Sequence, residues 1–196
     1  MTLLHNISRT LQRRRNATWH ALGYDTQVRP ETPADYAAVE QLTHDAFNHD
    51  AEVTLIKALH QQPGSISLVA EQHGKLVGHI LFSVAHLADQ ANITLMALAP
   101  MAVTNVLQHQ GIGSALVRAG LELCRARGAA AVVVLGHPGY YPRFGFAPAS
   151  RFSISCPWQV PDDAFMLLAL KPALLKGKSG QVVYHRAFTE LLPSAG

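Results

Sequence analysis

Two glycines, Gly111 and Gly113, stand two residues apart at the start of an amphipathic segment, and Gln108 precedes the first by three residues. An apolar segment, Leu95–Val103, runs into this loop. Glycine lets the backbone turn its N–H groups toward a ligand and lets that ligand approach closely. The first turn of a helix adds unpaired N–H donors and the positive end of the helix dipole. The spacing therefore predicts an anion-binding loop over residues 110–114, and a ligand that carries phosphates.

Two other phosphate-binding motifs, the P-loop and the dinucleotide-binding fingerprint, do not match this sequence. A P-loop ends in Gly-Lys-Ser/Thr, and the loop here contains no lysine. The dinucleotide-binding fingerprint requires a small residue three positions after its second glycine, where this chain has Leu116. That fingerprint also follows the first strand of its unit, whereas this loop lies in mid-chain. Neither alternative fits.

The order Gln-x-x-Gly-x-Gly resembles the acetyl-CoA pyrophosphate loop of the GNAT acetyltransferase superfamily. About 30 residues later, Tyr141 stands four residues before Gly145-Phe146, and this resembles the Tyr-x-x-x-Gly-Phe element of the same superfamily. The resemblance extends from Val28 to Leu170. The runs His137–Tyr141 and Cys156–Trp158 resemble a branch of small bacterial predicted N-acetyltransferases without an assigned substrate.

The resemblance implies an α/β (α+β) fold with a mixed, mostly antiparallel central sheet, one splayed parallel strand pair and flanking helices. It also implies transfer of an acetyl group from acetyl-CoA to a primary amine, by direct attack in a ternary complex. Backbone groups at the end of the apolar strand would pair with the pantetheine arm, and the loop would hold the pyrophosphate. The expected cofactor-binding residues are Ala102, Val103, Gln108, Gln110, Gly111, Ile112, Gly113 and Ser114.

Tyr141 is the candidate general acid, because its ordinary pKa of about 10 suits proton donation to a departing thiolate. Its neighbour Tyr140 is interpreted as a packing residue. Many superfamily members carry a glutamate on the strand before the loop, but residues 92–103 contain no carboxylate here. Glu52, His137 and His86 are therefore the candidate bases, and a water chain without a dedicated base is the alternative.

The elements that must position these residues follow from the hydropathy pattern. Gly128 is expected to end the helix that starts at the loop, and the almost purely apolar run Ala129–Leu135 is typical of a strand buried on both faces. Strand, loop, helix and buried strand form a βαβ unit, which implies parallel pairing. Pro100 cannot donate to a sheet ladder and predicts a bulge or an edge. Further helices are expected from Thr32 and over Ala51–Gln61, and further strands over Ser65–Glu71, Leu76–Val84 and Ala164–Leu170.

Composition narrows the class of protein. The chain has 196 residues, 48% of them hydrophobic and 15% charged, which predicts a folded domain with a substantial core. The net charge of +3 suits anionic ligands and is too small to indicate a nucleic-acid partner. Two cysteines do not form a disulfide framework, and no apolar run is long enough to span a membrane, so a cytoplasmic protein is predicted. No metal site is predicted, since the histidines do not show a ligand spacing.

Three segments are expected: a basic N-terminal extension (1–26), the acetyltransferase domain (27–172) and a C-terminal tail (173–196). A small-molecule amine is the expected acceptor. One alternative is a non-catalytic acyl-CoA sensor, which would not need Tyr141. Another is an acetyltransferase acting on charged tRNA or a protein N-terminus, which rests on the basic run Arg13–Arg15. The C-terminal strand is a candidate contact in a homodimer.

Overall fold

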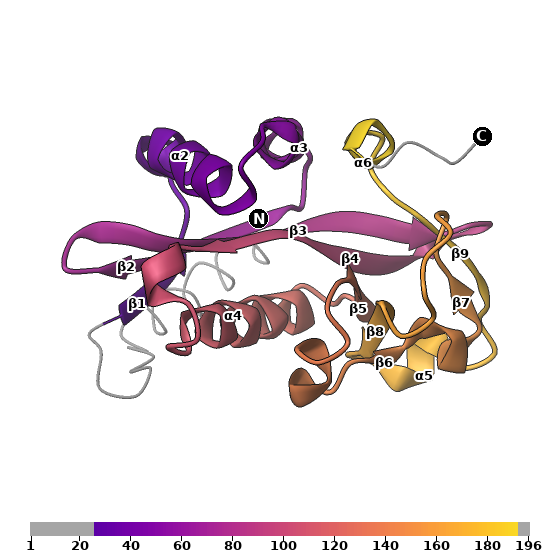
Figure 1. Cartoon of the computed structure of the whole chain (residues 1–196). Helices are drawn as coiled ribbons and strands as arrows, with labels where there is room; N and C mark the ends of the chain where they lie inside the picture. Colours follow the sequence, from indigo (N-terminus) through magenta and orange to yellow (C-terminus); the bar gives the residue numbers. More distant parts are fainter. Residues whose placement is uncertain (1–25, 192–196) are drawn as a thin grey trace, which may run out of the picture.

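The computed structural model describes residues 26–191. One sheet runs through the molecule, with helices on both faces (Figure 1). Its strands are β1 (Thr26–Pro30), β2 (Ile66–Gln72), β3 (Lys75–Leu87), β4 (Gln90–Val103), β5 (Ala131–Leu135), β6 (Ala147–Pro148), β7 (Ile154–Ser155), β8 (Phe165–Ala169) and β9 (Gly180–Val183). The α-helices are α2 (Tyr36–Phe47), α3 (Ala51–His60), α4 (Ile112–Ala126), α5 (Pro172–Leu175) and α6 (Ala187–Leu191). Short 3-10 helices are η1 (Pro33–Asp35), η2 (Asn105–Leu107), η3 (Tyr141–Phe144) and η4 (Ala149–Phe152).

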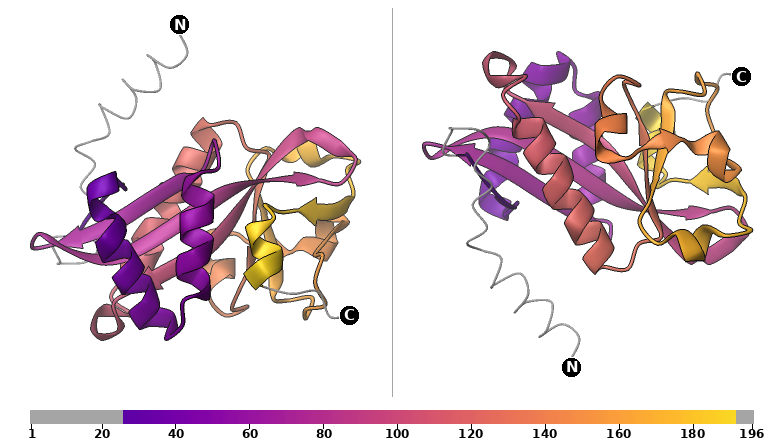
Figure 2. Two further views of the ribbon diagram at one scale, coloured as in Figure 1. Left: turned by 90° about the horizontal axis from the view of Figure 1, so that it is seen from above. Right: turned by 90° about the horizontal axis from the view of Figure 1, so that it is seen from below.

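The main path of the sheet has the order β1-β2-β3-β4-β5-β8-β6, and every neighbouring pair is antiparallel except β4–β5. Helices α2 and α3 cross one face of the sheet, and α4 crosses the other face (Figure 2). The mixed, mostly antiparallel sheet predicted from the sequence is therefore confirmed. A second parallel pairing, between β7 and β9, joins only two residues on each strand.

Local signals in the sequence account for the helix boundaries. Thr32 and Asp35 form a capping box, in which the Thr32 backbone N–H donates to Asp35 Oδ2 at 2.8 Å, and Pro33 occupies the first helical position. At the far end of α4, Gly128 takes a positive φ of 85° and ends the helix, as predicted. Gly120, on the buried face of α4, lies against Phe82: a Cβ at Gly120 would come within 2.1 Å of that ring.

The sheet separates two layers of core. The layer under α2 and α3 contains residues such as Val39, Ile56 and Leu81, and the layer under α4 contains residues such as Leu116 and Phe82. Alternate residues of β3 and β4 therefore face opposite layers. This places the N-terminus of α4 on one side of the sheet and the α2–α3 pair on the other.

The parallel pair β4–β5 opens partway along its length. Its register covers only Leu95–Ala97 against Ala131–Val133, although β4 continues to Val103. The pairing of β4 with β3 shifts register around Pro100, because Ile80 pairs with Met101 whereas Phe82 pairs with Leu98. The bulge predicted at Pro100 is thus confirmed, and within residues 26–191 the end of β4 has no ladder partner on its β5 side.

The C-terminal segment forms part of the domain. Strand β9 pairs with β3 and β7, and the side chains of Leu175, Val182 and Phe188 are buried in the core layer that also lies under α2 and α3. The expected boundary after residue 172 therefore does not end the core, because the strand and helix that follow complete it. The expected N-terminal extension falls outside the described residues, except for Thr26 in β1. Among the described residues, no helix is long and apolar enough to cross a membrane.

Candidate active site

The loop between β4 and α4 presents a row of open backbone donors. Gly111 precedes the helix with φ 88°, and the first bond of the helix runs from the Ala115 N–H to the Gly111 carbonyl at 2.9 Å. The N–H groups of residues 112–114 precede that bond and have no acceptor within the helix. Gly111 makes no side-chain cap, so the start of α4 is available to an anion.

The side chains of two glutamines in this loop form hydrogen bonds to the residues that precede it. Gln108 donates through Nε2 to the Val103 carbonyl at 3.3 Å and to Asn105 Oδ1 at 3.1 Å. Gln110 donates to the Val106 carbonyl at 3.3 Å. Both amides bind backbone or side chain of the preceding turn, η2. Gln108 therefore braces the loop, which is one of the roles its position suggests.

Tyr140 reaches the start of α4 from the other side of the open pair. A Cβ built on Gly113 would lie 2.9 Å from the Tyr140 hydroxyl oxygen and 3.7 Å from Val103 Cγ2. The three residues thus meet where the splayed strands face the helix N-terminus. The Arg143 guanidinium carbon lies 4.7 Å above the Tyr140 ring and is placed to hold it there. The sequence pattern assigned Tyr140 only a packing role and missed this position.

Tyr141 is buried beside Tyr140. Its ring packs edge-on against Tyr140 and Phe146, with centroids 5.1 and 5.6 Å apart, and it fills the space in which Gly136 would carry a Cβ. Burial raises the pKa of Tyr141 well above its ordinary value. The hydroxyl is therefore protonated at neutral pH, but it is a weaker acid than the ordinary tyrosine on which the sequence-based assignment rests.

The three candidate bases lie on different elements. Glu52, at the start of α3, has its carboxylate 2.9 Å from His49 Nδ1. His137 follows β5, and its carbonyl accepts a hydrogen bond from the Tyr140 N–H at 3.0 Å, which places it one turn from Tyr141. His86 lies near the end of β3, opposite Thr94. His137 is thus close to Tyr140 and Tyr141 through a single turn of the chain. Glu52 lies on α3, and α3 and α4 cover opposite faces of the sheet.

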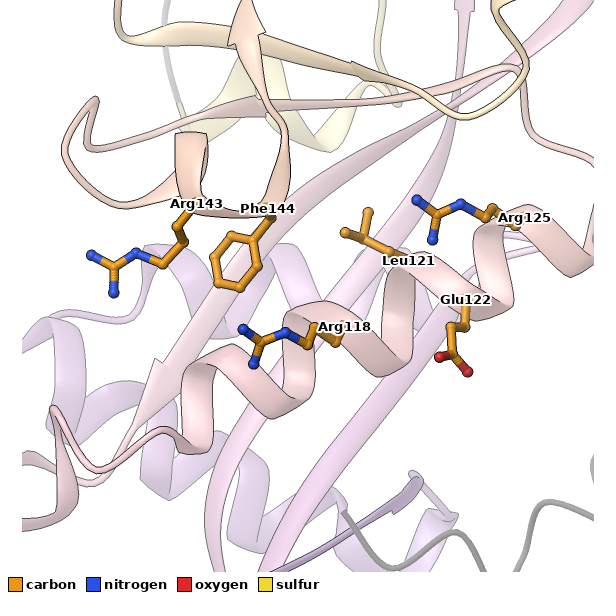
Figure 3. Close-up of a pocket in the computed structure, with 6 residues that line it drawn as sticks. All are labelled: Arg118, Leu121, Glu122, Arg125, Arg143 and Phe144. Carbon is orange, nitrogen blue, oxygen red and sulfur yellow. The ribbon is translucent and has the colours of Figure 1, made fainter. Parts of the chain in front are cut away.

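A cleft beside α4 carries three arginines. Arg118, Glu122 and Arg125 line it from α4, and Arg143 lines it from η3 (Figure 3). The Arg118 guanidinium carbon lies 5.5 Å above the ring of Phe144, another lining residue. Three guanidinium groups beside one carboxylate make this surface positively charged. Only the fold shows this cleft, because its two sides come from separate segments.

The two cysteines do not form a nucleophilic site. Cys124 is fully buried on α4, and burial raises the pKa of its thiol to about 12. Burial also raises the pKa of the Cys156 thiol above its ordinary value. A thiol in this state is a poor acyl acceptor, because the thiolate is the nucleophile. Cys124 is therefore a core residue.

The family model for the acetyltransferase (GNAT) family matches residues 32–146. This range contains the loop, α4 and Tyr141. The chain belongs to the GNAT family. Its fold and its class, acetyltransferase, agree with the resemblance seen in the sequence.

Individual GNAT relatives cover most of the chain. It is 33% identical to the uncharacterized N-acetyltransferase YhbS of Escherichia coli over 163 residues, which is 82% of this chain and 97% of that protein. A crystal structure of E. coli YhbS in complex with CoA superposes with a TM-score of 0.79 at 32% identity, over 85% of this chain and 93% of that one. A GNAT acetyltransferase from Brucella melitensis, solved with acetyl-CoA, has a TM-score of 0.70 at 33% identity, over 84% and 99% of the two chains.

Proposed function

We propose that this GNAT protein is an acetyl-CoA-dependent N-acetyltransferase that acts on a primary amine of a small molecule. The observation that carries the proposal is the open end of the β4–β5 pair, which leads directly to the uncapped N-terminus of α4. The relatives solved with CoA or acetyl-CoA support the choice of cosubstrate. A thioester with a long amide-bearing arm and a pyrophosphate has the chemistry that these two features accept.

The pyrophosphate is assigned to the N–H groups of residues 111–114, with Gln108 and Gln110 keeping the loop in shape. The arm is assigned to the free side of β4. The Thr104 N–H donates to the Val77 carbonyl at 3.0 Å, so the antiparallel alternation turns the N–H and carbonyl of Ala102 toward β3 and those of Met101 and Val103 toward β5. The expected pairing through Ala102 therefore moves to Met101. At Val103 the N–H remains for the arm, because the Val103 carbonyl accepts a hydrogen bond from Gln108 Nε2.

The reaction needs one bond to form and one to break. The neutral amine attacks the thioester carbonyl carbon, a C–N bond forms, and the C–S bond breaks to release a thiolate. Tyr141 donates its proton to that sulfur, and a backbone N–H at the end of β4 polarises the carbonyl oxygen. A base accepts the proton that the amine loses. Glu52 and His137 remain the candidates, and a water chain remains the alternative.

The arginine cleft is assigned to the nucleotide end of coenzyme A. Arg118 lies six residues after Ile112, where α4 begins, or about 9 Å along the helix axis. Arg143 contacts the ring of Tyr140. A phosphate bound here would be paired by guanidinium groups, which match phosphate oxygens in pairs. Arg143 is the residue that would connect the two phosphate sites.

Calorimetric titration with acetyl-CoA tests the proposal, with Gly111→Glu as the matched variant. Micromolar binding by the wild type and none by the folded variant is expected, because a carboxylate at this position repels the pyrophosphate. A screen of small amines for release of free CoA then tests turnover. Failure of the folded wild type to bind acetyl-CoA would overturn the assignment. Binding without turnover of any amine, and an unaltered Tyr141→Phe variant, would indicate a sensor.

A further inference from the structure

A buried carboxylate lies between two histidines on the face of the sheet that carries α2 and α3. Glu31 follows β1, His60 ends α3, and His79 lies in the middle of β3. The side chains are 2%, 11% and 0% exposed, respectively. Glu31 Oε2 lies 2.8 Å from His60 Nε2 and 3.7 Å from His79 Nε2. Among the described residues, this is the one group of three metal-ligating side chains whose ligand atoms all lie within 4.8 Å of one another.

The Glu31 carboxylate lies inside the protein with two imidazoles beside it. The nearest arginine in sequence, Arg29, is bonded instead to Asp35 and Glu71. A buried anion requires a cation close to it.

Hydrogen bonding within the group leaves one carboxylate oxygen unused. Glu31 Oε1 is buried and has no partner, although its sister oxygen contacts His60. His79 Nε2 lies 2.8 Å from the Ser67 hydroxyl. A proton on one histidine would satisfy only the oxygen that already has a partner. A metal ion bound through Oε2, with a water as its fourth ligand, would satisfy both oxygens, because that water can donate to Oε1.

We propose that Glu31, His60 and His79 bind Zn²⁺. Two imidazoles and a carboxylate form a donor set that zinc accepts, at metal–ligand distances of about 2.0–2.2 Å. Tetrahedral geometry with these distances separates ligand atoms by about 3.3–3.5 Å, and the contacts of 2.8 and 3.7 Å lie on either side of this range. A water would complete the shell.

The position of the group assigns the ion a structural role. It would join the end of α3 to the sheet at β1 and β3, and so fix the helix pair that covers this face. Tyr36 stacks on His60 with ring centroids 4.3 Å apart and an interplanar angle of 17°, which covers the exposed side of the group. The acetyl-transfer proposal does not depend on the ion, because no residue of this group belongs to the loop or to the tyrosine pair.

Zn²⁺ alone is the probe, added to full-length protein stripped with a chelator. We expect one equivalent to bind and the Tm to rise by about 5–10 °C at roughly 100 times Kd. Co²⁺ in its place should show the intense visible absorption of a tetrahedral site. His60→Gln and Glu31→Gln should each weaken binding by at least about 100-fold, more than the loss of an outer-shell partner.

His44→Gln is the matched control. His44 also lies 2.8 Å from a carboxylate, that of Asp50, but its pair is exposed and belongs to no three-ligand group. This variant should bind Zn²⁺ like the wild type. The proposal is overturned if the stripped wild type binds no Zn²⁺, or if His60→Gln binds it as tightly as the wild type, since the ion would then lie elsewhere. A wild-type Co²⁺ complex without the intense visible absorption of a tetrahedral site would also overturn the proposal, and this test needs no variant that must fold.

Discussion

Gly111 and Gly128 stand at opposite ends of α4 and share one backbone conformation. Their φ angles are 88° and 85°, in the left-handed region that side chains disfavour. An alanine at either position costs about 1–2 kcal/mol. Around Gly128, the nearest atom to a new Cβ is Lys171 Nζ at 3.5 Å, an ordinary contact. Gly111→Ala and Gly128→Ala therefore impose similar backbone strain at the two ends of one helix, and only the first lies at the proposed pyrophosphate site.

The difference between the two variants should appear in cofactor affinity. Relief of strain at Gly111 changes φ and turns the N–H groups of residues 112–114 away from their present direction. A hydrogen bond to a charged group contributes about 1.5–3 kcal/mol. Loss of one such bond lowers the affinity for acetyl-CoA by about 10–150-fold. Gly128→Ala leaves these donors in place and should bind acetyl-CoA like the wild type.

Calorimetry measures both quantities. Thermal scans should show that each variant loses about 2–8 °C in Tm, which confirms that the strain is matched. Titrations with acetyl-CoA should then separate the two variants by at least tenfold in Kd. Equal Kd values for the two variants, at matched Tm, would refute the placement of the pyrophosphate at the start of α4.

Three further predictions test other parts of the structure. Tyr141→Phe should lower kcat by about 100-fold or more and leave acetyl-CoA affinity unchanged, whereas a larger effect on kcat from Tyr140→Phe would transfer the acid role to that neighbour. CoA differs from dephospho-CoA by its 3′-phosphate. Arg118→Gln should reduce the ratio of the affinities for these two ligands, measured by titration. An unchanged ratio would show that the 3′-phosphate does not bind in the cleft. Hydrogen bonds from Arg29, opposed by burial, lower the pKa of Asp35 below its ordinary value. The stability from this pair is therefore present above pH about 4 and lost as the pH falls. Asp35→Asn should cost about 2 kcal/mol at pH 7 and less at pH 3 by urea denaturation, and an equal cost at both pH values would contradict this.

Local features of this protein could be predicted from neighbouring residues. The capping box at Thr32, the glycine that ends α4 and the bulge at Pro100 each depend on backbone preferences within a few residues. The loop over residues 108–114 belongs to the same class, since the glycine at 111 and the helix that follows it shape the donors. The order of Gln108, Gly111 and Gly113, with Tyr141 four residues before Gly145, was sufficient to indicate the family, and the loop is the basis of the proposed pyrophosphate site.

Tertiary structure decided which distant residues meet. The sequence placed the free backbone groups at Ala102 and Val103. The ladder with β3 turns those of Ala102 toward β3 and those of Met101 away from it, because the direction of a strand's hydrogen bonds depends on its partner. Residues 173–196 were expected to form a tail outside the domain, yet Val182 is buried in the core and pairs with β3.

The same reason explains why the sequence analysis did not find the group of Glu31, His60 and His79. Its two histidines lie 29 and 48 residues further along the chain, and no spacing rule for metal ligands covers such separations. The ends of β1 and α3 and the middle of β3 come together only through the register of the sheet and the packing of α3 across it. Sequence by itself determined the conformation of each short segment, and the fold determined which segments share a site, because such contacts depend on long-range packing that local patterns do not encode.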